Sequence, residues 1–411
     1  MESVRSTHDY ENDDVTFWSN FYLPRFELLL KESGSYEPAE VEHYVTFLES
    51  LIPLLGPSPQ PRDKKPPTDS QCTYNCMPLE FSMNFSDNKP PIVRFILEPL
   101  GQDVHDLQAL HGKYEECLVA MLDQMPSEWR DSTWLRALDD AFTIRTPTEQ
   151  LKLRERLPPH VPRLTRGYFG IDLGSGRNRT TTNVKPYWTP VGKALASLPD
   201  ALVDIADDKK QGGQEFVARK TLAAGFARAR LLTFQSVRDL NDGLVPAVET
   251  LERYVAHECK IPTPGLEFIF TGVDCAPTDD ARVKIYFRCA NNAFASVKDA
   301  VSLGGRYGDE AVSTFLNELR EIWHLLRCDG MPGDLSEDFS KSVLHPKHRM
   351  NGLCVGYEIR AGRSRPEVKL YVPMFQFHRD DMSAVRAMES ICELKGWDFK
   401  QGRYEQMIQK V

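Results

Sequence analysis

The sequence predicts an α+β fold in which an antiparallel β-barrel is surrounded by helices. Strand-like stretches recur in pairs, helical periodicity follows each pair, and closing such a sheet removes its exposed edges. These alternations give the order helix–strand–strand, repeated along the chain. Four strand pairs are predicted, at 79–85 and 92–98, 167–173 and 182–188, 266–273 and 281–288, and 352–360 and 366–373.

Helical periodicity separates these pairs. We expect helices at 15–31, 38–55, 105–125, 191–207, 214–235, 245–258, 310–326 and 382–395. Residues 56–70 contain five prolines and are typical of an exposed connector. The predicted organisation is a single domain over 1–411, with N-terminal helices and this proline-rich connector in 1–70 and the repeated units in 71–411.

Composition excludes several classes of function. The 411 residues carry a formal net charge of −9, which argues against a nucleic-acid partner. The sequence shows no secretory signal and no apolar run long enough to cross a membrane, so a cytoplasmic protein is expected. The nine cysteines form no CxxC pair, which favours reduced thiols over disulfides or a zinc site.

A cationic and aromatic pattern recurs on three strand candidates. It takes the form Lys-x-Tyr, and because alternate residues of a strand share a face, each lysine and its tyrosine point the same way. Outward-pointing, solvated side chains are the alternative interpretation. Three such strands around one lumen would gather buried cations that require an anion, and a diphosphate suits them. The pattern comprises Lys185 with Tyr187, Arg282 and Lys284 with Tyr286, and Lys369 with Tyr371.

The tyrosines and one glutamate suggest what accompanies the anion. A tyrosine ring attracts a nearby cation, so these rings can shield an allylic carbocation formed as diphosphate departs. Glu80, Ser82 and Asn84 alternate with apolar residues and share a face, and Arg94 follows on the next strand. Glu80 is then a candidate acceptor for an indole N–H, and a structural ion pair with Arg94 is the alternative.

Together these motifs resemble the fungal aromatic prenyltransferases of the dimethylallyltryptophan-synthase superfamily, over residues 15–400. The resemblance rests on their order and spacing: Pro78-Leu-Glu80-Phe-Ser82-Met-Asn84, Val93-Arg94-Phe95-Ile-Leu-Glu98-Pro99, Gly170-Ile-Asp172-Leu173, Lys185-Pro-Tyr187-Trp-Thr-Pro190, Arg282-Val-Lys284-Ile-Tyr286-Phe, Gly356-Tyr357-Glu358-Ile359, and Pro366-Glu367-Val-Lys369-Leu-Tyr371-Val-Pro373.

The resemblance implies an αββα prenyltransferase barrel with a solvent-filled lumen. It implies a metal-independent Friedel–Crafts alkylation, without a cofactor, that moves a dimethylallyl or longer prenyl group from its diphosphate to an indole or other electron-rich aromatic small molecule in alkaloid biosynthesis. No Asp-Asp-x-x-Asp spacing is present. Glu80 would bind the acceptor, Tyr187, Tyr286 and Tyr371 would form the shield, and the diphosphate would be bound by Arg94, Lys185, Arg282, Lys284 and Lys369.

The sequence departs from the family at its C-terminal end. The family barrel has five helix–strand–strand units, and four strand pairs are counted here before the chain stops at Val411, in or after a helix that follows Trp397. The barrel is therefore expected to be incomplete at the C-terminus. Two alternatives stay open: a degenerate or truncated relative that binds prenyl diphosphate without catalysis, and a subunit completed by a partner or by a second copy in a homodimer.

Overall fold

The computed structural model describes residues 7–59, 70, 72–73, 75–86, 89–100, 107–130, 132–157, 164–177, 180–199, 213–277, 280–329, 336–346, 348, 350–397 and 403–410. The chain divides into two compact units. The first consists of residues 1–233 with 272–281 and 411, and the second of residues 234–271 with 282–410.

The first unit contains four antiparallel strands that neighbour one another in chain order. They are β1 (Leu79–Ser86), β2 (Lys89–Leu97), β3 (Gly167–Asp172) and β4 (Asn183–Trp188). The register places Glu80 opposite Ile96, Ile96 opposite Gly170, and Gly170 opposite Lys185. These four residues therefore form one row across one face of the sheet. The first two predicted strand pairs are confirmed.

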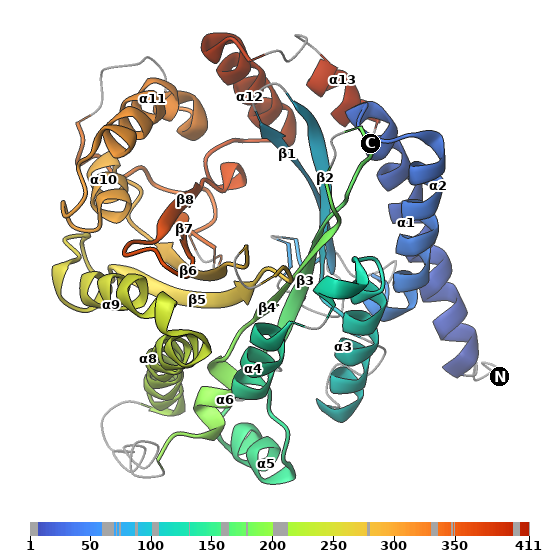
Figure 1. Cartoon of the computed structure of the whole chain (residues 1–411), viewed down its shortest axis with the longest axis horizontal. Helices are drawn as coiled ribbons and strands as arrows, with labels where there is room; N and C mark the ends of the chain where they lie inside the picture. Colours follow the sequence, from blue (N-terminus) through green and yellow to red (C-terminus); the bar gives the residue numbers. More distant parts are fainter. Residues whose placement is uncertain are drawn as a thin grey trace. The chain divides into compact units, whose positions relative to one another are not determined.

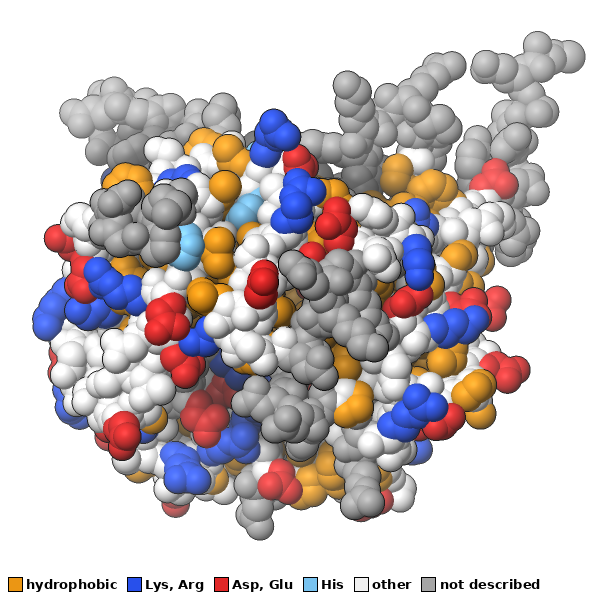
Figure 2. Space-filling view, turned by 90° about the horizontal axis from the view of Figure 1, so that it is seen from above, with side chains coloured by type: hydrophobic (Ala, Val, Ile, Leu, Met, Phe, Trp, Pro, Cys, Tyr) orange, Lys and Arg blue, Asp and Glu red, His pale blue; other side chains and the backbone are white. Residues whose placement is uncertain are grey.

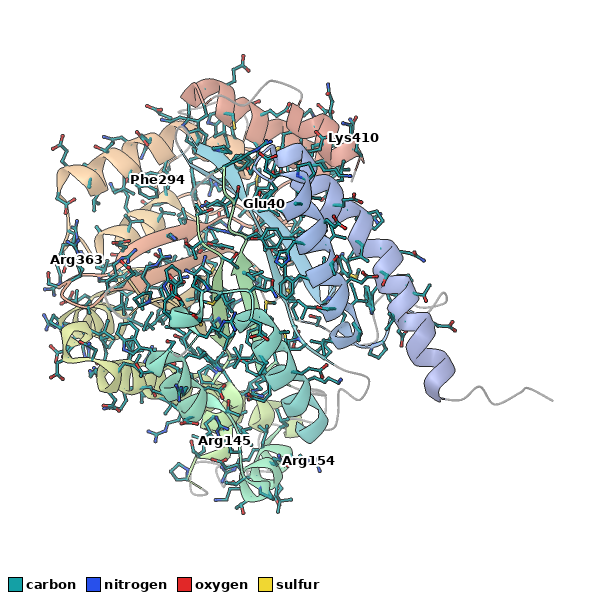
Figure 3. The ribbon with its side chains drawn as sticks, turned by 45° about the vertical axis from the view of Figure 1, so that its right-hand side comes forward. Glu40, Arg145, Arg154, Phe294, Arg363 and Lys410 are labelled. Carbon is teal, nitrogen blue, oxygen red and sulfur yellow. The ribbon has the colours of Figure 1, made fainter. Side chains whose placement is uncertain are left out.

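N-terminal helices cover the first two strands. α1 (Thr7–Ser33) and α2 (Pro38–Leu51) lie beside β1 and β2 (Figure 1), and the short helix η1 (Ile52–Leu55) follows. A capping box and Pro38 begin α2, whose Glu40, labelled in Figure 3, accepts a 2.8 Å hydrogen bond from the Gly176 backbone N–H. The Tyr44 hydroxyl donates to the Gly174 carbonyl at 2.7 Å. These bonds hold α2 against the loop that follows β3.

Further helices of this unit pack on β3 and β4. Tyr114 of α3 lies 4.4 Å from Phe169 between ring centroids, and Trp188 donates a 2.9 Å hydrogen bond to Asp139 of α4. The elements are α3 (Leu107–Leu122), η2 (Ser127–Trp129), α4 (Thr133–Phe142), α5 (Pro147–Arg156), α6 (Val191–Ala196) and α8 (Gly213–Leu240), of which residues up to 233 belong to this unit.

The second unit repeats the arrangement of strands and helices. Its strands neighbour one another in chain order as β5 (Leu266–Val273, of which residues up to 271 belong to this unit), β6 (Val283–Cys289), β7 (Leu353–Ile359) and β8 (Glu367–Tyr371). The apolar alternate residues Val283, Ile285 and Phe287 are fully buried, and Tyr357 donates a 3.1 Å hydrogen bond to a carbonyl of α10. The helices are η4 (Asp242–Leu244), α9 (Val245–Arg253), η5 (Tyr254–Glu258), α10 (Phe294–Ser302), α11 (Glu310–Arg327), η6 (Met374–Gln376), α12 (Asp381–Lys395) and α13 (Arg403–Lys410).

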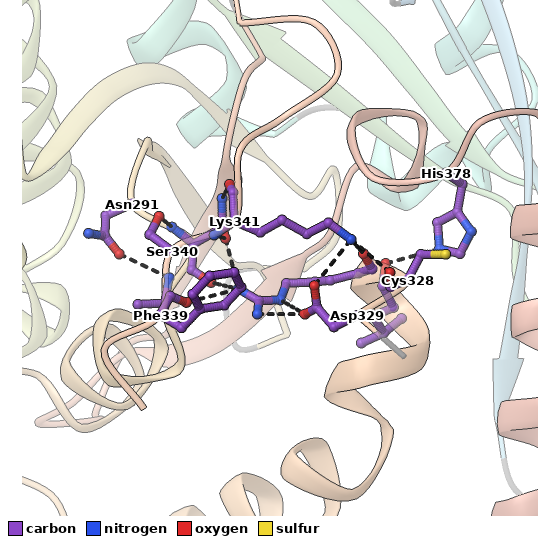
Figure 4. Close-up of polar contacts among 11 residues, drawn as sticks. Asn291, Cys328, Asp329, Phe339, Ser340, Lys341 and His378 are labelled. Atoms are coloured by element: carbon purple, nitrogen blue, oxygen red, sulfur yellow. Dashed lines mark hydrogen bonds and ion pairs between the residues drawn. The ribbon is translucent and has the colours of Figure 1, made fainter. Parts of the chain in front are cut away.

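A buried polar cluster holds the segment after α11 (Figure 4). Arg327 and Asp329 form an ion pair of 2.5 Å with side chains that are 1% and 3% exposed. Lys341 adds a second cation to Asp329 at 3.1 Å, and Arg327 also donates to the Asn292 carbonyl at 2.6 Å. The cluster therefore fixes the chain on both sides of residues 330–335.

Among the α-helices that the structure describes, α4, α5 and α10 were not predicted from periodicity. The predicted helix at 191–207 is wrong at 197–199, because α6 ends at Ala196 and Pro199 disfavours helical geometry in the residue before it. Residues 200–207 and most of the connector at 56–70 lie outside the described residues. The helix expected after Trp397 is present as α13.

Three further features accompany this fold. Acidic and basic side chains are interspersed over the face seen in Figure 2. None of the helices in the described residues combines the length and hydropathy that a bilayer-spanning segment requires. All nine cysteines are free thiols, as expected from their spacing.

Candidate active site

Glu80 lies on the face of β1 that is turned away from the helices. Its neighbour Phe81 packs against α1, with ring centroids 5.7 Å from Tyr22 and 5.1 Å from Phe26. Because successive residues of a strand alternate, Glu80, Ser82 and Asn84 point to the opposite face, as predicted. In each unit, we call the face of the strands that is turned away from the helices the inner face.

The Glu80 carboxylate has no hydrogen bond or ion pair with any residue that the structure describes. Its side chain is accessible to solvent, yet burial raises its pKa to about 7. The surrounding protein thus disfavours the charged form, although the side chain itself is exposed. The ion pair with Arg94 that the sequence left open is not formed; Arg94 pairs with Asp172 instead.

Asp172 joins two of the predicted diphosphate-binding cations in the first unit. Its Oδ1 lies 2.8 Å from Arg94 Nε, and its Oδ2 accepts a hydrogen bond from Lys185 Nζ. Register explains the first contact, because Arg94 and Asp172 are directly opposed between β2 and β3. Lys185 is opposite Gly170, which leaves its side chain room to reach Asp172.

Lys185 is 6% exposed, and burial lowers its pKa below the ordinary value, an effect that the negative charge of Asp172 opposes. A buried lysine needs such a partner to stay protonated. Asp172 therefore serves two purposes at once: it orients Arg94 and Lys185, and it favours the charged form of the lysine.

Glu358 has the corresponding position in the second unit. Its carboxylate accepts a hydrogen bond from Arg282 Nη1 at 2.7 Å and pairs with Lys369 Nζ at 2.6 Å. Lys284, 3% exposed, is directly opposite Glu358 in the β6–β7 register. Burial alone would raise the pKa of Glu358, but the hydrogen bond from Lys369 and the charges of Arg282, Lys369 and Lys284 hold it below its ordinary value.

The two clusters share one local design. In β3 a glycine precedes the acid by two residues (Gly170, Asp172), and in β7 the same spacing recurs (Gly356, Glu358). Each glycine is opposite the lysine that its neighbouring acid binds: Gly170 opposes Lys185, and Gly356 opposes Lys369. Neither acid was assigned a role from the sequence, although both segments belong to the motifs that resemble the family. Their common Gly-x-acid spacing, facing Lys-x-Tyr, is the signal that identifies them.

The tyrosines of the pattern lie over glycines. A Cβ added at Gly170 would come within 3.1 Å of the Tyr187 ring, and one at Gly272 within 2.3 Å. In the second unit, Tyr286 is directly opposite Gly356. The rings occupy the space that these glycines leave empty, and Tyr187 and Tyr286 are 9% and 6% exposed.

An aromatic row extends over the inner face of the second unit. Tyr286 lies 4.4 Å from Phe270 and 5.9 Å from Tyr371 between ring centroids. Tyr371 is 43% exposed. The structure thus brings the predicted residues together as two sets, Arg94, Lys185 and Tyr187 in the first unit and Arg282, Lys284, Tyr286, Lys369 and Tyr371 in the second. In the first unit Glu80 and Lys185 lie in the same row, separated by β2 and β3, at about 14 Å from strand spacing.

Glu80, which has no polar partner among the described residues, the Arg–Lys clusters and the tyrosine surface are accompanied by a family match over nearly the whole chain. The family model described as tryptophan dimethylallyltransferase matches residues 14–407. The chain belongs to this family. It is therefore a prenyltransferase, and the sequence-based identification is confirmed.

Two curated relatives are similar to this chain over most of their length. The indole diterpene prenyltransferase terF of Tolypocladium album is 28% identical, over 96% of this chain and 85% of that protein. The indole prenyltransferase tdiB of Emericella nidulans is 27% identical, over 96% of this chain and 88% of that protein.

Solved structures confirm the fold. AnaPT from Neosartorya fischeri superposes with a TM-score of 0.66 at 19% identity, covering 93% of this chain and 82% of that one. NotF in complex with brevianamide F and DMSPP gives a TM-score of 0.65 at 20% identity, covering 99% of this chain and 87% of that one. The predicted αββα prenyltransferase barrel is correct, with four strand pairs in the described residues.

Proposed function

We propose that this enzyme transfers a dimethylallyl or longer prenyl group from its diphosphate to an indole-bearing acceptor, by a metal-independent Friedel–Crafts alkylation. The observation that carries the proposal is the pair of Arg–Lys clusters on the inner faces, together with Glu80. Clustered Arg and Lys bind the oxygens of a diphosphate, and preorganised positive charge stabilises the departing anion.

The clusters and the tyrosines would act on the prenyl donor. The bond between the allylic carbon and oxygen breaks, its electron pair leaves with diphosphate, and Arg94, Lys185, Arg282, Lys284 and Lys369 neutralise the charge that develops. Tyr187, Tyr286 and Tyr371 present ring faces to the allylic cation, which attract it and keep water away. The acceptor ring then forms the new carbon–carbon bond, and loss of the ring proton to a base restores aromaticity.

Glu80 would bind the aromatic acceptor. An ionised carboxylate without a protein partner accepts a hydrogen bond from an indole N–H, and this raises the electron density of the ring during attack. The raised pKa of Glu80 suits such a role, because the group can also take up the N–H proton near neutral pH. An indole acceptor is further supported by the relatives named indole and indole diterpene prenyltransferases.

Relatives with other acceptors in their names define the wider choice. An O-glucose prenyltransferase of Phomopsis amygdali is 25% identical, and the 4-O-dimethylallyl-L-tyrosine synthase of Claviceps purpurea is 23% identical. Indole diterpenes, tryptophan and tryptophan-containing cyclic dipeptides are therefore the first acceptors to offer, with tyrosine as the contrast.

The test is an assay of EDTA-treated protein with dimethylallyl or geranyl diphosphate and this acceptor panel, read by mass spectrometry. We expect a product heavier by one prenyl group, lost in Glu80→Ala. A wild-type protein that binds the diphosphate but forms no product would favour the non-catalytic relative, and activity that rises steeply with protein concentration would favour completion by a second copy.

We also propose that the protein is cytoplasmic, as expected from the sequence.

A further inference from the structure

The carboxylates of Asp172 and Glu358 contact the same side chains that the proposed function assigns to diphosphate. Asp172 engages Arg94 and Lys185, and Glu358 engages Arg282 and Lys369. Both acids lie on inner faces, two residues after a glycine that opposes the bound lysine. The same arrangement is present among the described residues of both units, which argues against an incidental surface ion pair.

The burial of these groups makes their charge important. The Glu358 side chain is 2% exposed. The Asp172 side chain is 19% exposed, and the side chain of its partner Lys185 is 8% exposed. Several cations held this closely repel one another, and an ionised carboxylate among them offsets that repulsion while the site holds no donor. Glu358 stays ionised, since its pKa lies below the ordinary value.

A diphosphate presents oxygens to the same N–H donors. Each N–H that a carboxylate occupies must be shared or exchanged when the diphosphate binds, and the carboxylate charge repels the diphosphate charge. Arg282 and Lys369 have further N–H groups to offer, so they can exchange partners without leaving their places.

We infer that Asp172 and Glu358 are resident counter-anions of the donor site: they hold the Arg and Lys side chains in place in the empty enzyme and weaken diphosphate binding enough for the product diphosphate to leave. They are positioning residues, because they act through the cations. The inference rests on the proposed function, in which these cations bind the donor.

The inference predicts a gain of affinity on removal of a charge. Asp172→Asn and Glu358→Gln keep the shape of each side chain and remove its negative charge. We expect each variant to bind inorganic diphosphate about tenfold more tightly than the wild type, the scale of one unit charge a few ångströms away in a partly screened site. In turnover, tighter product binding should lower kcat and KM for the donor together.

The experiment is isothermal titration calorimetry with inorganic diphosphate and with a non-reactive prenyl thiolodiphosphate. Glu358→Asp, which keeps the charge, should stay within about twofold of the wild type. Glu267→Gln is the matched control, because Glu267 is a β5 carboxylate whose partner, Arg288, lies outside the clusters. Because the two acids belong to different units, one variant decides if the other does not fold.

The outcomes separate the inference from the function. Neutral variants that fold and bind diphosphate no more tightly than the wild type, or more weakly, overturn the counter-anion role. A wild type that binds neither probe overturns the proposed donor site itself. Tightening in the neutral variants, with Glu358→Asp and Glu267→Gln unchanged, supports the inference.

Discussion

The ring centroids of Tyr286 on β6 and Tyr371 on β8 are 5.9 Å apart, although strand β7 lies between these two strands. The residue between them is Gly356, which is opposite Tyr286 and has no side chain to keep the rings apart. A Cβ at Gly356 would lie 3.0 Å from Tyr286 Cε1 and 3.3 Å from Tyr371 Cε2. The glycine thus makes two tyrosines from non-adjacent strands into one continuous surface.

Gly356→Ala should separate these rings and admit water to the carbocation. We expect a larger share of the donor to end as free prenyl alcohol, with donor affinity changed less than the ratio of alcohol to prenylated product. Gas chromatography of the alcohol beside mass spectrometry of the product gives that ratio. Gly308→Ala is the control, since nothing lies within 4 Å of a Cβ there. An unchanged ratio in Gly356→Ala would show that the joined rings do not protect the cation.

Glu80→Gln should lower the prenylation rate by about 10²–10³, the usual cost of one preorganised polar contact. The wild-type rate should rise with pH through about 7 as Glu80 ionises, and the variant should lack this step. Steady-state rates across this range, at saturating donor, provide the measurement. A retained pH step in Glu80→Gln would assign the titration to another group.

The contribution of Glu80 to the stability of the folded chain should fall with rising pH, opposite to the prenylation rate. The pKa of Glu80 is about 7 in the folded chain against 4.5 ordinarily, so the folded state holds the proton more tightly in that interval. This contribution to stability is complete below pH 4.5 and is lost as pH rises through about 7. Glu80→Gln should therefore gain thermal stability relative to the wild type as pH rises, measured by differential scanning fluorimetry.

Lys185→Met should raise KM for the donor about 10–100-fold, the cost of a lost hydrogen bond from a charged group, and leave KM for the acceptor near its wild-type value. Because burial lowers the pKa of Lys185, donor affinity of the wild type should also fall at alkaline pH, where the lysine loses its proton. Lys185→Arg, always charged, should bind donor with a flatter pH profile.

Lys193→Met is the control for that series, because Lys193 pairs with Glu149 on helices of the same unit, away from the inner face. A donor KM that rises equally in Lys193→Met and Lys185→Met would point to a general loss of structure. A selective rise in Lys185→Met supports a direct contact between Lys185 and the diphosphate.

The sequence was sufficient for the strands and for the side of each strand that carries chemistry. Period-two alternation depends only on neighbouring residues, so Glu80 and Lys284 were assigned to the face that they occupy. The helix α5 was missed because the segment is too short for periodicity to reveal, although Thr146 and Glu149 form a capping box around Pro147 that marks its start.

The ion-pair partners could not be predicted in this way. Arg282 and Glu358 are 76 positions apart and meet through the register of β6 and β7. Arg94 could pair with Glu80 or with Asp172 on residue types alone, and the alignment of β2 with β3 decides for Asp172. The pKa of Glu80 likewise depends on desolvation in the folded chain, which no local pattern encodes.

Asp329→Ala should lower the free energy of unfolding by about 3–5 kcal/mol, because it leaves the buried Arg327 without its anion. Lys341 would lose the same partner. Thermal and urea unfolding measure the effect, and Glu321→Ala, which removes an exposed partner of Lys395, should cost less than about 1 kcal/mol. Since this cluster touches none of the inner-face cations, donor KM of the folded fraction should stay unchanged. A donor KM that changes in Asp329→Ala at a temperature where the protein is folded would mean that the cluster also shapes the donor site.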